Sequence, residues 1–238
     1  MSNYQIDETE VSRALKLIAP PVTELRVMNA TVAGERRTGG TFSGYFDSDH
    51  HAELIAELRR VQNASAAYFI FNELKPELLA RRCNRAEIIG DRTPVTGDKD
   101  ILRRRFLPVD VDSVRPAGVS ATDAERTAAY EMVIDIDAHL WEKGYPPGII
   151  ADSSNGAHLL IPLDLPANDH GFVKRLLTEL AARFNTDKAT VDTSVHNASR
   201  IWKLYGCESR KGDNCPALGR VWRLSKILTE CQELPHDA

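Results

Sequence analysis

The order of predicted helices and strands in the second half of the chain constrains the fold more than any other feature. The capping box Thr122-Asp-Ala-Glu125 opens one helical stripe of apolar residues, and Asn168 is placed to cap a second stripe. Short apolar runs before, between and after these helices indicate strands. In order, we predict a strand from residue 106, a helix over 122–143, strands over 149–151 and 158–163, a helix over 168–184 and a strand over 189–195. This β-α-β-β-α-β order is that of RRM-like folds.

The first hundred residues predict a separate α/β layer. Its elements are a helix over 7–18, a hairpin of strands 23–31 and 41–46, a helix capped by Asp47 or Asp49 that runs through Val61, a buried strand over 66–71 and a short helix over 74–82. Residues 83–100 are polar and rich in turn formers, so we predict a mobile connection there. We therefore expect an α+β fold of two α/β lobes, 1–105 and an RRM-like 106–238, with the active site in the cleft between them.

Composition limits the classes of function. The 238 residues carry a formal net charge of −4, so nucleic acid binding would need local basic patches rather than a polycationic chain. Four cysteines without a C-x-x-C pair argue against a disulfide scaffold and for a reducing compartment. No apolar run approaches the length of a membrane span, and the N-terminus shows no signal pattern. We expect a cytoplasmic protein with no membrane partner.

Asp110-Val-Asp112 lies in the first strand of the RRM-like half. Strand side chains alternate with period two, so both carboxylates project from one face while Val109 and Val111 point into the core. Two adjacent carboxylates repel each other, and a divalent cation between them removes that cost. Oxygen ligands suit Mg²⁺ or Mn²⁺. The alternative for so short a motif is a pair of solvated aspartates at the end of a strand.

Two further segments carry side chains that suit a site for phosphates. Ser153-Ser-Asn-Gly-Ala-His158 is a tight turn of small residues that enters a strand headed by a histidine. Small residues allow the backbone to approach a phosphate closely. Val191-Asp192 places a lone aspartate in an apolar setting. Taken singly, the histidine is an ordinary hydrogen-bonding residue and the aspartate an ordinary cap, so the inference depends on the three segments together.

In this order and on these elements, the segments resemble the archaeo-eukaryotic primase superfamily, in particular its primase-polymerase branch from phages, plasmids and other mobile elements. That family has a D-x-D motif on one strand, an s-x-H motif on another and a single aspartate after an apolar residue. The similarity covers about residues 22–228. Its main stretches are Leu107-Pro-Val-Asp-Val-Asp-Ser-Val-Arg-Pro116, Asp152-Ser-Ser-Asn-Gly-Ala-His158 and Val191-Asp-Thr-Ser-Val-His-Asn-Ala-Ser-Arg200.

The resemblance implies a DNA primase or template-dependent DNA polymerase that acts on single-stranded DNA or a primer-template with dNTPs or NTPs. Asp110, Asp112 and Asp192 would bind two Mg²⁺ or Mn²⁺ ions, and His158 would hydrogen-bond the incoming triphosphate. The turn that would offer backbone N–H groups to the triphosphate consists of Ser153, Ser154, Asn155 and Gly156. Many relatives work with a helicase or accessory domain, so a partner of that kind on another chain is expected.

The sequence departs from the family pattern at two places. Ser154 stands where branch members commonly have glycine, so a positive φ at this position would strain the serine. Tyr205-Gly-Cys207 replaces a more usual Pro-Gly-Thr. Neither change touches the carboxylates, so we expect any consequence in nucleotide selection rather than in catalysis.

The segment 200–226 combines seven Lys or Arg with only two acidic residues and with interleaved aromatic residues. Basic groups for phosphates and aromatic faces for bases are typical of single-strand binding. The candidates for nucleotide contact are Arg200, Lys203, Asn72 and Arg81. The candidates for nucleic acid contact are Arg210, Lys211, Trp202 and Tyr205. The alternative is that the tryptophans belong to the core and the charges form a solvated rim.

Two other functions use parts of the same pattern. A metal-dependent phosphodiesterase or nuclease would use the same carboxylates, whereas a non-catalytic replication-initiation module that binds single-stranded DNA would need none of them. The full carboxylate set favours an enzyme. His196, Cys207 and Cys215 lie close in sequence, but their spacing fits no zinc finger pattern, so we do not expect zinc. No G-x-x-x-x-G-K-[ST] motif occurs in these residues, so no helicase motor is encoded in them.

Overall fold

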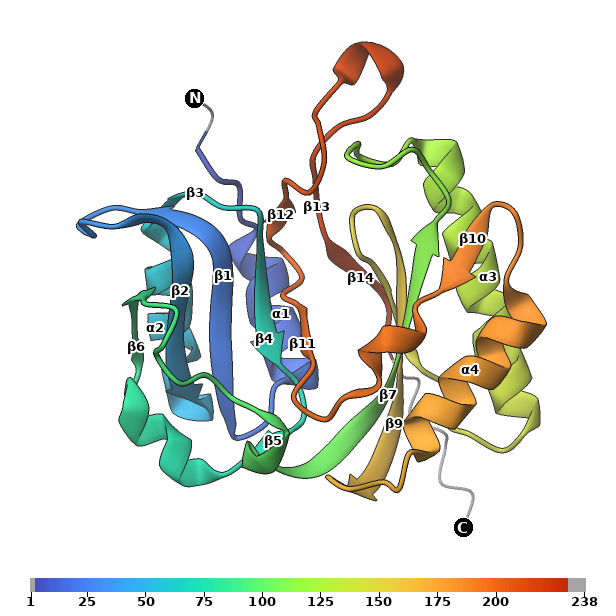
Figure 1. The fold of residues 1–238 in the computed structure, drawn as a ribbon, viewed down its shortest axis with the longest axis horizontal. Helices are drawn as coiled ribbons and strands as arrows, with labels where there is room; N and C mark the ends of the chain where they lie inside the picture. The colour runs from blue at the N-terminus through green and yellow to red at the C-terminus, as the bar shows by residue number, and fades with distance from the viewer. Residues whose placement is uncertain (1–2, 231–238) are drawn as a thin grey trace.

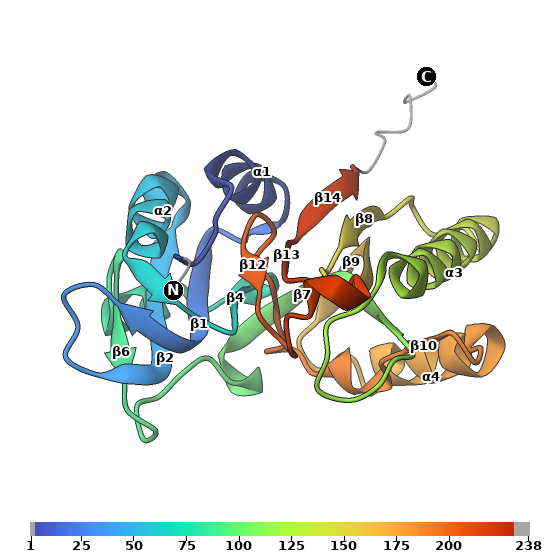
Figure 2. The same ribbon diagram turned by 90° about the horizontal axis from the view of Figure 1, so that it is seen from above.

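The computed structural model describes residues 3–230 and shows a mixed α+β protein built on two antiparallel sheets (Figure 1). The helix α2 (His51–Arg59) packs on one sheet, and α3 (Asp123–Glu142) and α4 (Phe172–Phe184) pack on the other; α1 (Glu8–Ile18) lies between α2 and the second sheet's strand β14 (Lys226–Thr229) (Figure 2). The predicted α+β class is therefore confirmed. Within the described part of the chain, no helix is both long enough and apolar enough to cross a membrane.

The first sheet combines the N-terminal part of the chain with one strand from the C-terminal part. Its strands in spatial order are β11 (Ile201–Lys203), β4 (Ala66–Ile70), β1 (Val22–Val32), β2 (Thr38–Asp47) and β6 (Arg85–Ile89), and β3 (Val61–Asn63) also pairs with β1. The predicted hairpin of β1 and β2 is confirmed, with Val27 opposite Phe42. Both side chains are fully buried, because every second residue of these strands faces the helices.

Three predictions for the first half need correction. The helix predicted to run through Val61 ends at Arg59, and Val61 instead begins β3, where it pairs with Val32. The segment predicted as a mobile connection contains the edge strand β6, which pairs with β2. The short helix near residue 76 is a 3-10 helix, Pro76–Arg81. A single buried apolar residue such as Val61 fits a short strand as well as a helix, so the spacing of apolar residues in the sequence could not distinguish the two.

The second sheet carries the element order predicted for the second half. Its strands in spatial order are β10 (Ala189–Val191), β7 (Ile101–Ser113), β9 (Gly156–Pro166), β8 (Ile149–Asp152) and β14 (Lys226–Thr229), and β5 (Glu73–Leu74) pairs with the start of β7. All these pairs are antiparallel. Along the chain, β7, α3, β8, β9, α4 and β10 follow one another as predicted.

The caps of the two long helices show how far local sequence determines the helix ends. The predicted capping box of α3 is present: the Thr122 N–H donates to the Glu125 carboxylate at 2.8 Å, and the Glu125 N–H donates to the Thr122 hydroxyl at 3.3 Å. The cap predicted at Asn168 is wrong, because α4 starts later. Asp169 instead accepts a hydrogen bond from the Val173 N–H at 2.9 Å.

Two strands connect the halves of the chain. β7 begins at Ile101 and runs as one strand past residue 105, and β11 leaves the C-terminal half to pair with β4 of the first sheet. At the junction, the ring of Phe71 packs edge to face against Phe106 and Trp202, with ring centroids 6.2 and 5.6 Å apart. One apolar core therefore includes residues of both sheets.

Candidate metal centre

Three aspartates meet where β7 and β10 lie side by side. Asp110 and Asp112 project from one face of β7, whereas Val109 and Val111 are fully buried on the other face, as predicted. Asp192 follows β10 directly, and its backbone N–H donates to the Asp110 carbonyl oxygen at 2.8 Å. One carboxylate oxygen from each aspartate lies within 4.8 Å of the other two. This cluster could bind a metal ion.

The electrostatic environment of the aspartates favours a cation between them. Burial and the neighbouring Asp110 carboxylate raise the pKa of Asp112. Burial also acts to raise the pKa of Asp110, but the adjacent His158 and the charges of Lys211 and Lys203 together outweigh burial, so that pKa is lowered. The donor set consists of carboxylate oxygens, which are the ligands of hard cations such as Mg²⁺ and Mn²⁺. The residues present therefore fit the metal ions implied by the sequence.

His158 is held by a chain of buried hydrogen bonds. The Trp202 indole N–H donates to the Tyr205 hydroxyl oxygen at 2.8 Å, which leaves the Tyr205 proton to be donated to His158 Nδ1, 2.9 Å away. We infer from these donors that Nδ1 is the acceptor and that Nε2 carries the proton of a neutral ring. Nε2 lies 3.3 Å from Asp110 Oδ1. His158 is therefore placed to donate a hydrogen bond at the metal centre.

Trp202 and Tyr205 do not have the nucleic acid contacts predicted for them. Trp202 is 2% exposed and Tyr205 is 0% exposed, so neither ring is accessible to stack on a base. Trp202 instead packs on His158, with ring centroids 4.1 Å apart. The prediction is wrong because both residues lie at the junction of the two sheets, where aromatic rings fill the core. Trp202 therefore follows the alternative given above, in which the tryptophans belong to the core.

The turn before His158 contains one glycine that must be glycine and one strained serine. Gly156 lies opposite Asp112 in the pairing of β7 with β9, where a Cβ would come within 2.2 Å of the Val111 carbonyl oxygen. Ser154 has a φ of 82°, in the left-handed region that favours glycine. Its buried hydroxyl has no hydrogen-bond partner among the described residues. The condition for strain identified from the sequence is therefore met.

The backbone N–H groups of this turn are used within the turn and its surroundings. The Ser154 N–H donates to the Asp152 carboxylate at 2.6 Å, and the Ser153 N–H donates to the Gly156 carbonyl at 3.1 Å. The predicted cradle of N–H groups therefore needs correction for these two residues. The residues of the turn that line the pocket around the aspartates are Ser153 and Asn155.

A pocket of about 370 Å³ surrounds the three aspartates and draws its walls from both sheets. The second sheet and its loops supply the carboxylates, His158 and the serine turn. The first sheet and the segment after it supply Tyr68, Lys203 and Lys211. The four arginines and lysines of the lining are Arg115, Arg200, Lys203 and Lys211. The structure therefore brings three predicted cations together with the predicted acids.

Lys203 and Lys211 flank Tyr68 on the first-sheet side of the pocket. Their Nζ atoms lie 5.9 and 5.3 Å from the centre of the Tyr68 ring. Lys203 is 7% exposed and donates to the Ser209 hydroxyl at 3.0 Å. Burial and, next, the charge of Lys211 lower the pKa of Lys203 to about 7. An anion in the pocket would offset this desolvation, so the lysine pair favours an anionic ligand.

Arg200 reaches the metal centre through one serine. Its Nη2 donates to the Ser194 hydroxyl at 3.0 Å, and that hydroxyl donates to the Asp192 carboxylate at 3.1 Å. The Ser194 N–H also donates to Asp192, at 2.7 Å. Asp192 is therefore the N-cap of a short 3-10 helix and not part of a longer strand, which corrects the strand predicted through residue 195.

Arg115 and Tyr68 line the pocket but were not singled out from the sequence. Arg115 Nη1 lies 4.0 Å from Asp112 Oδ1. Its position three residues after Asp112 could have indicated it from the sequence. Tyr68 lies inside the continuous apolar run of β4, and only its hydroxyl distinguished it from a core residue.

Three predicted contacts lie outside the pocket. Asn72 is 1% exposed, and its amide donates to a backbone carbonyl at 2.8 Å, so its predicted nucleotide contact is wrong in this structure. Arg81 donates to a tyrosine hydroxyl at 3.2 Å and does not line the pocket. Arg210 donates to Glu208 at 2.7 Å and covers the Trp222 ring at 5.0 Å. In each case the polar group serves packing between segments that are distant in sequence.

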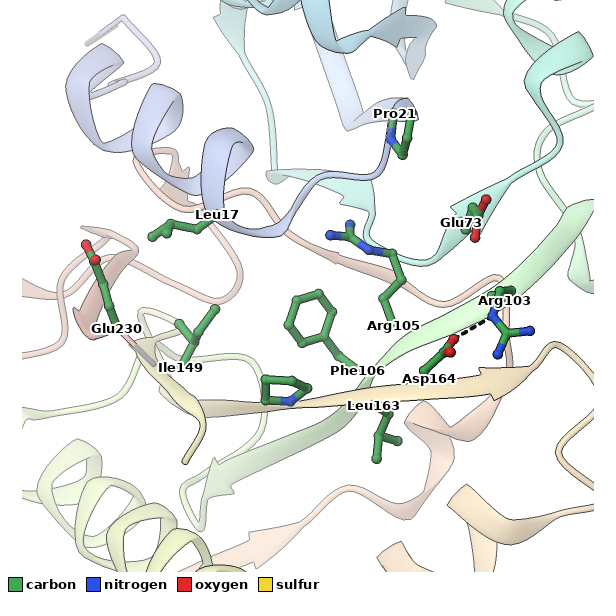
Figure 3. A pocket seen from close by; sticks show the side chains of 11 residues that line it. Leu17, Pro21, Glu73, Arg103, Arg105, Phe106, Ile149, Leu163, Asp164 and Glu230 are labelled. Carbon is green, nitrogen blue, oxygen red and sulfur yellow. Dashed lines mark hydrogen bonds and ion pairs between the residues drawn. The ribbon is translucent and has the colours of Figure 1, made fainter. Parts of the chain in front are cut away.

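A larger hollow of about 850 Å³ lies at the other end of the junction between the sheets (Figure 3). Its charged side chains are of both signs, and two of them, Arg103 and Asp164, form an ion pair of 2.5 Å. Arg105 donates to the Ile18 carbonyl oxygen at 2.7 Å. None of the site residues predicted from the sequence lines this hollow. Volume alone therefore does not identify the functional site.

Known proteins offer no independent evidence for the role of this centre. Its assignment depends on the positions of the aspartates, the histidine and the surrounding cations. No family model matches the chain, and no curated protein and no solved structure is significantly similar to it.

Proposed function

We propose that this protein is a DNA primase or template-dependent DNA polymerase that transfers nucleotides in a metal-dependent reaction on single-stranded DNA. The observation that carries the proposal is the cluster of Asp110, Asp112 and Asp192 within 4.8 Å, in one pocket with His158 and four cationic side chains. The strand order β10-β7-β9-β8 supports an RRM-like catalytic lobe. In this proposal the first sheet belongs to the N-terminal lobe, and the cleft between the lobes holds the substrates.

The charges of the pocket suit a nucleoside triphosphate. Without ions, four arginines and lysines face three aspartates, so the pocket is close to neutral. Two Mg²⁺ or Mn²⁺ ions held by the aspartates would make it strongly positive, activate the attacking 3′-hydroxyl and stabilise the leaving pyrophosphate. Lys203 and Lys211 would then face the triphosphate oxygens from the first sheet. A polyanionic substrate is therefore favoured over a neutral one.

The protein groups have separate roles in this proposal. Asp110 and Asp112 present their carboxylates from a strand whose other face is buried in the core. Asp192 is fixed in position by two hydrogen bonds from Ser194. His158 donates its Nε2–H toward the triphosphate, because Tyr205 occupies Nδ1. The site is thus preorganised, which is the main source of catalysis in phosphoryl and nucleotidyl transfer.

The decisive experiment compares Asp112→Asn with Asp135→Asn, a matched change on the exposed side of α3. Both are assayed on a labelled primer-template with Mg²⁺ or Mn²⁺ and dNTPs. We expect at least about a 100-fold loss of extension for Asp112→Asn, because even indirect changes around a metal cost about 10- to 100-fold. Asp135→Asn should extend the primer like the wild type. Extension at the wild-type rate by Asp112→Asn would refute the assignment.

The same substrates separate the other two functions. Shortening of the labelled strand without dNTPs would favour a nuclease that uses the same carboxylates. Single-strand binding that is insensitive to metal and nucleotide, with no synthesis, would favour a non-catalytic initiation module. A primer-free reaction on single-stranded DNA with dNTPs or with NTPs then tests for priming and identifies the nucleotide used.

A further inference from the structure

One face of the first sheet extends outward from the metal centre. Lys203 pairs with Tyr68, and Tyr68 pairs with Arg26, so these three side chains form a row across β11, β4 and β1 on the same face. Lys203 and Tyr68 line the pocket of the aspartates, whereas Arg26 lies beyond it. The row therefore leads from the metal centre onto the open face of the first sheet.

Beyond the metal centre, this face carries a second hollow of about 270 Å³, which we call the slot. Met28 and Thr41 of β1 and β2 line it, together with Thr93 and Val95 from the loop after β6. Ile201 lines both the slot and the pocket of the aspartates, so the two hollows are adjacent. A ligand that passes the metal centre on the first-sheet side reaches the slot next.

The size and lining of the slot fit a single flat ring system. Its volume is below the roughly 300–1,000 Å³ of pockets that enclose drug-sized ligands. Met28, Val95 and Ile201 offer apolar and thioether contacts to the faces of a ring. The hydroxyls of Thr41 and Thr93 are hydrogen-bonding groups for its edges. This mixture of apolar faces and polar edges is the chemistry that recognises a nucleobase.

Arg26 adds a cation with a fixed orientation at the slot. Its guanidinium donates to the Glu24 carboxylate at 2.7 Å and to the Thr96 carbonyl at 2.9 Å. Its Nε is buried and has no hydrogen-bond partner among the described residues. A guanidinium held in this way can stack on a ring or face a phosphate without losing further side-chain entropy.

The surroundings of the slot are suited to the backbone of a nucleic acid strand. Arg37 and Arg92 are exposed at its rim: Arg92 lies between two lining residues of the loop, and Arg37 Nη1 is within 3.5 Å of the Cβ position of Gly90. Together with Lys203 they line the way from the metal centre past the slot, where Asp91 is the one acidic residue of the described lining. Cations along a track combined with a ring-sized hollow are the pattern of single-strand binding.

We propose that the slot receives one unpaired base of the single-stranded DNA template, close to the position being copied. This inference rests on the proposed function. The base of the incoming nucleotide is the poorer occupant, because the aspartates, His158 and Ser153 would hold its triphosphate on the second sheet, and only the lysine pair would reach it from the first. A template strand that crosses the first sheet meets the slot without displacing that nucleotide.

The test fills the slot from the loop. Thr93→Trp places an indole in the hollow without changing a strand, and Thr178→Trp on the exposed side of α4 is the matched control. DNA affinity is measured by fluorescence anisotropy on a primer-template. Since one stacked base contributes about 1–3 kcal/mol, we expect Thr93→Trp to bind about tenfold more weakly than the control.

An abasic scan makes the test independent of the folding of the variant. A single abasic site is moved along the template strand, and the wild type should lose about tenfold in affinity at one position beyond the primer end. Thr93→Trp should show no further loss at that position, because the contact is already absent. The proposal would be overturned if the wild type lost no affinity at any abasic position. It would also be overturned if Thr93→Trp bound the DNA as tightly as Thr178→Trp.

Three combinations of results separate the slot from the proposed function. A raised KM for the nucleotide with unchanged DNA affinity in Thr93→Trp would assign the slot to the incoming base and overturn the proposal. A wild-type protein that binds DNA and shows the abasic position but extends no primer would count against the proposed function while supporting the slot. A wild-type protein that extends primers but loses no affinity at any abasic position would refute the role of the slot and leave the proposed function standing.

Discussion

Replacing Ser154 by glycine should make the protein more stable, although it removes a side chain beside the candidate site. Ser154 is 2% exposed, its φ is 82°, and its hydroxyl has no partner among the described residues. Its N–H, which donates to Asp152 at 2.6 Å, is retained in glycine. The substitution therefore removes two unfavourable features and keeps the hydrogen bond that closes the turn.

The magnitude follows from these three contributions. A non-glycine residue in the left-handed region costs about 1–2 kcal/mol. A buried hydroxyl without a partner costs about 1–3 kcal/mol. Glycine gives back about 0.5–1 kcal/mol, because the unfolded chain gains conformational freedom. We expect the free energy of unfolding to rise by at least about 1 kcal/mol, which corresponds to about 2–4 °C in Tm for a chain of this size.

Urea denaturation followed by tryptophan fluorescence measures this change, since Trp202 is buried and reports on the junction of the sheets. The matched control is Ser153→Gly, whose φ is not positive, and which should lose about 0.5–1 kcal/mol. If Ser154→Gly is no more stable than the wild type, the strain assigned to this turn is refuted. Equal gains in both variants would show that the effect is not specific to the left-handed position.

Two other variants test the interior of the site. Tyr205→Phe leaves Trp202 Nε1 and His158 Nδ1 without partners, so we expect the free energy of unfolding to fall by about 2 kcal/mol. In primer extension we expect a higher KM for the nucleotide with a smaller change in kcat. An unchanged KM would contradict the role of Tyr205 in orienting His158. Lys203→Met removes an ammonium whose pKa of about 7 lies below its usual 10.5. Between these two pKa values the unfolded wild type binds more protons than the folded wild type, so the stability of the wild type rises with pH. Relative to Lys203→Met, its stability should be lowest and constant below about pH 7 and should rise toward about pH 10. Urea titrations that show a constant difference in stability across this range would refute the effect of burial on Lys203.

Local patterns in the sequence were sufficient for much of the fold and for the acidic half of the site. The capping box of Thr122 and Glu125 fixed the start of α3, and alternation in β7 placed Asp110 and Asp112 on one face. These features depend on neighbours within a few residues. Asp192 could be joined to them because β10 follows α4 in the predicted element order and pairs with β7.

The residues that the sequence misplaced depend on contacts between distant segments. Asn72 is polar and was expected at the nucleotide, yet its side chain accepts the Arg105 N–H at 2.9 Å and binds the Ala198 carbonyl. The predicted mobile connection contains β6 because Phe42 and its neighbours in β2 offered a free edge. Neither the acceptor for a buried amide nor the free edge of a sheet is visible in a local window.

The strand β11 shows why interleaved basic and aromatic residues should be interpreted with strand geometry. Ile201, Trp202 and Lys203 all line the pocket, but the Trp202 ring is buried in the core and packs against His158. A period of two thus divides the segment into a cationic face for the site and an aromatic face that supports it. The same rule separates Asp110 from Val109 and Val111 in β7. What the rule cannot supply is the partner of β11: its pairing with β4 brings Lys203 from the first sheet to the aspartates of the second, so the site exists only when the two sheets are packed together.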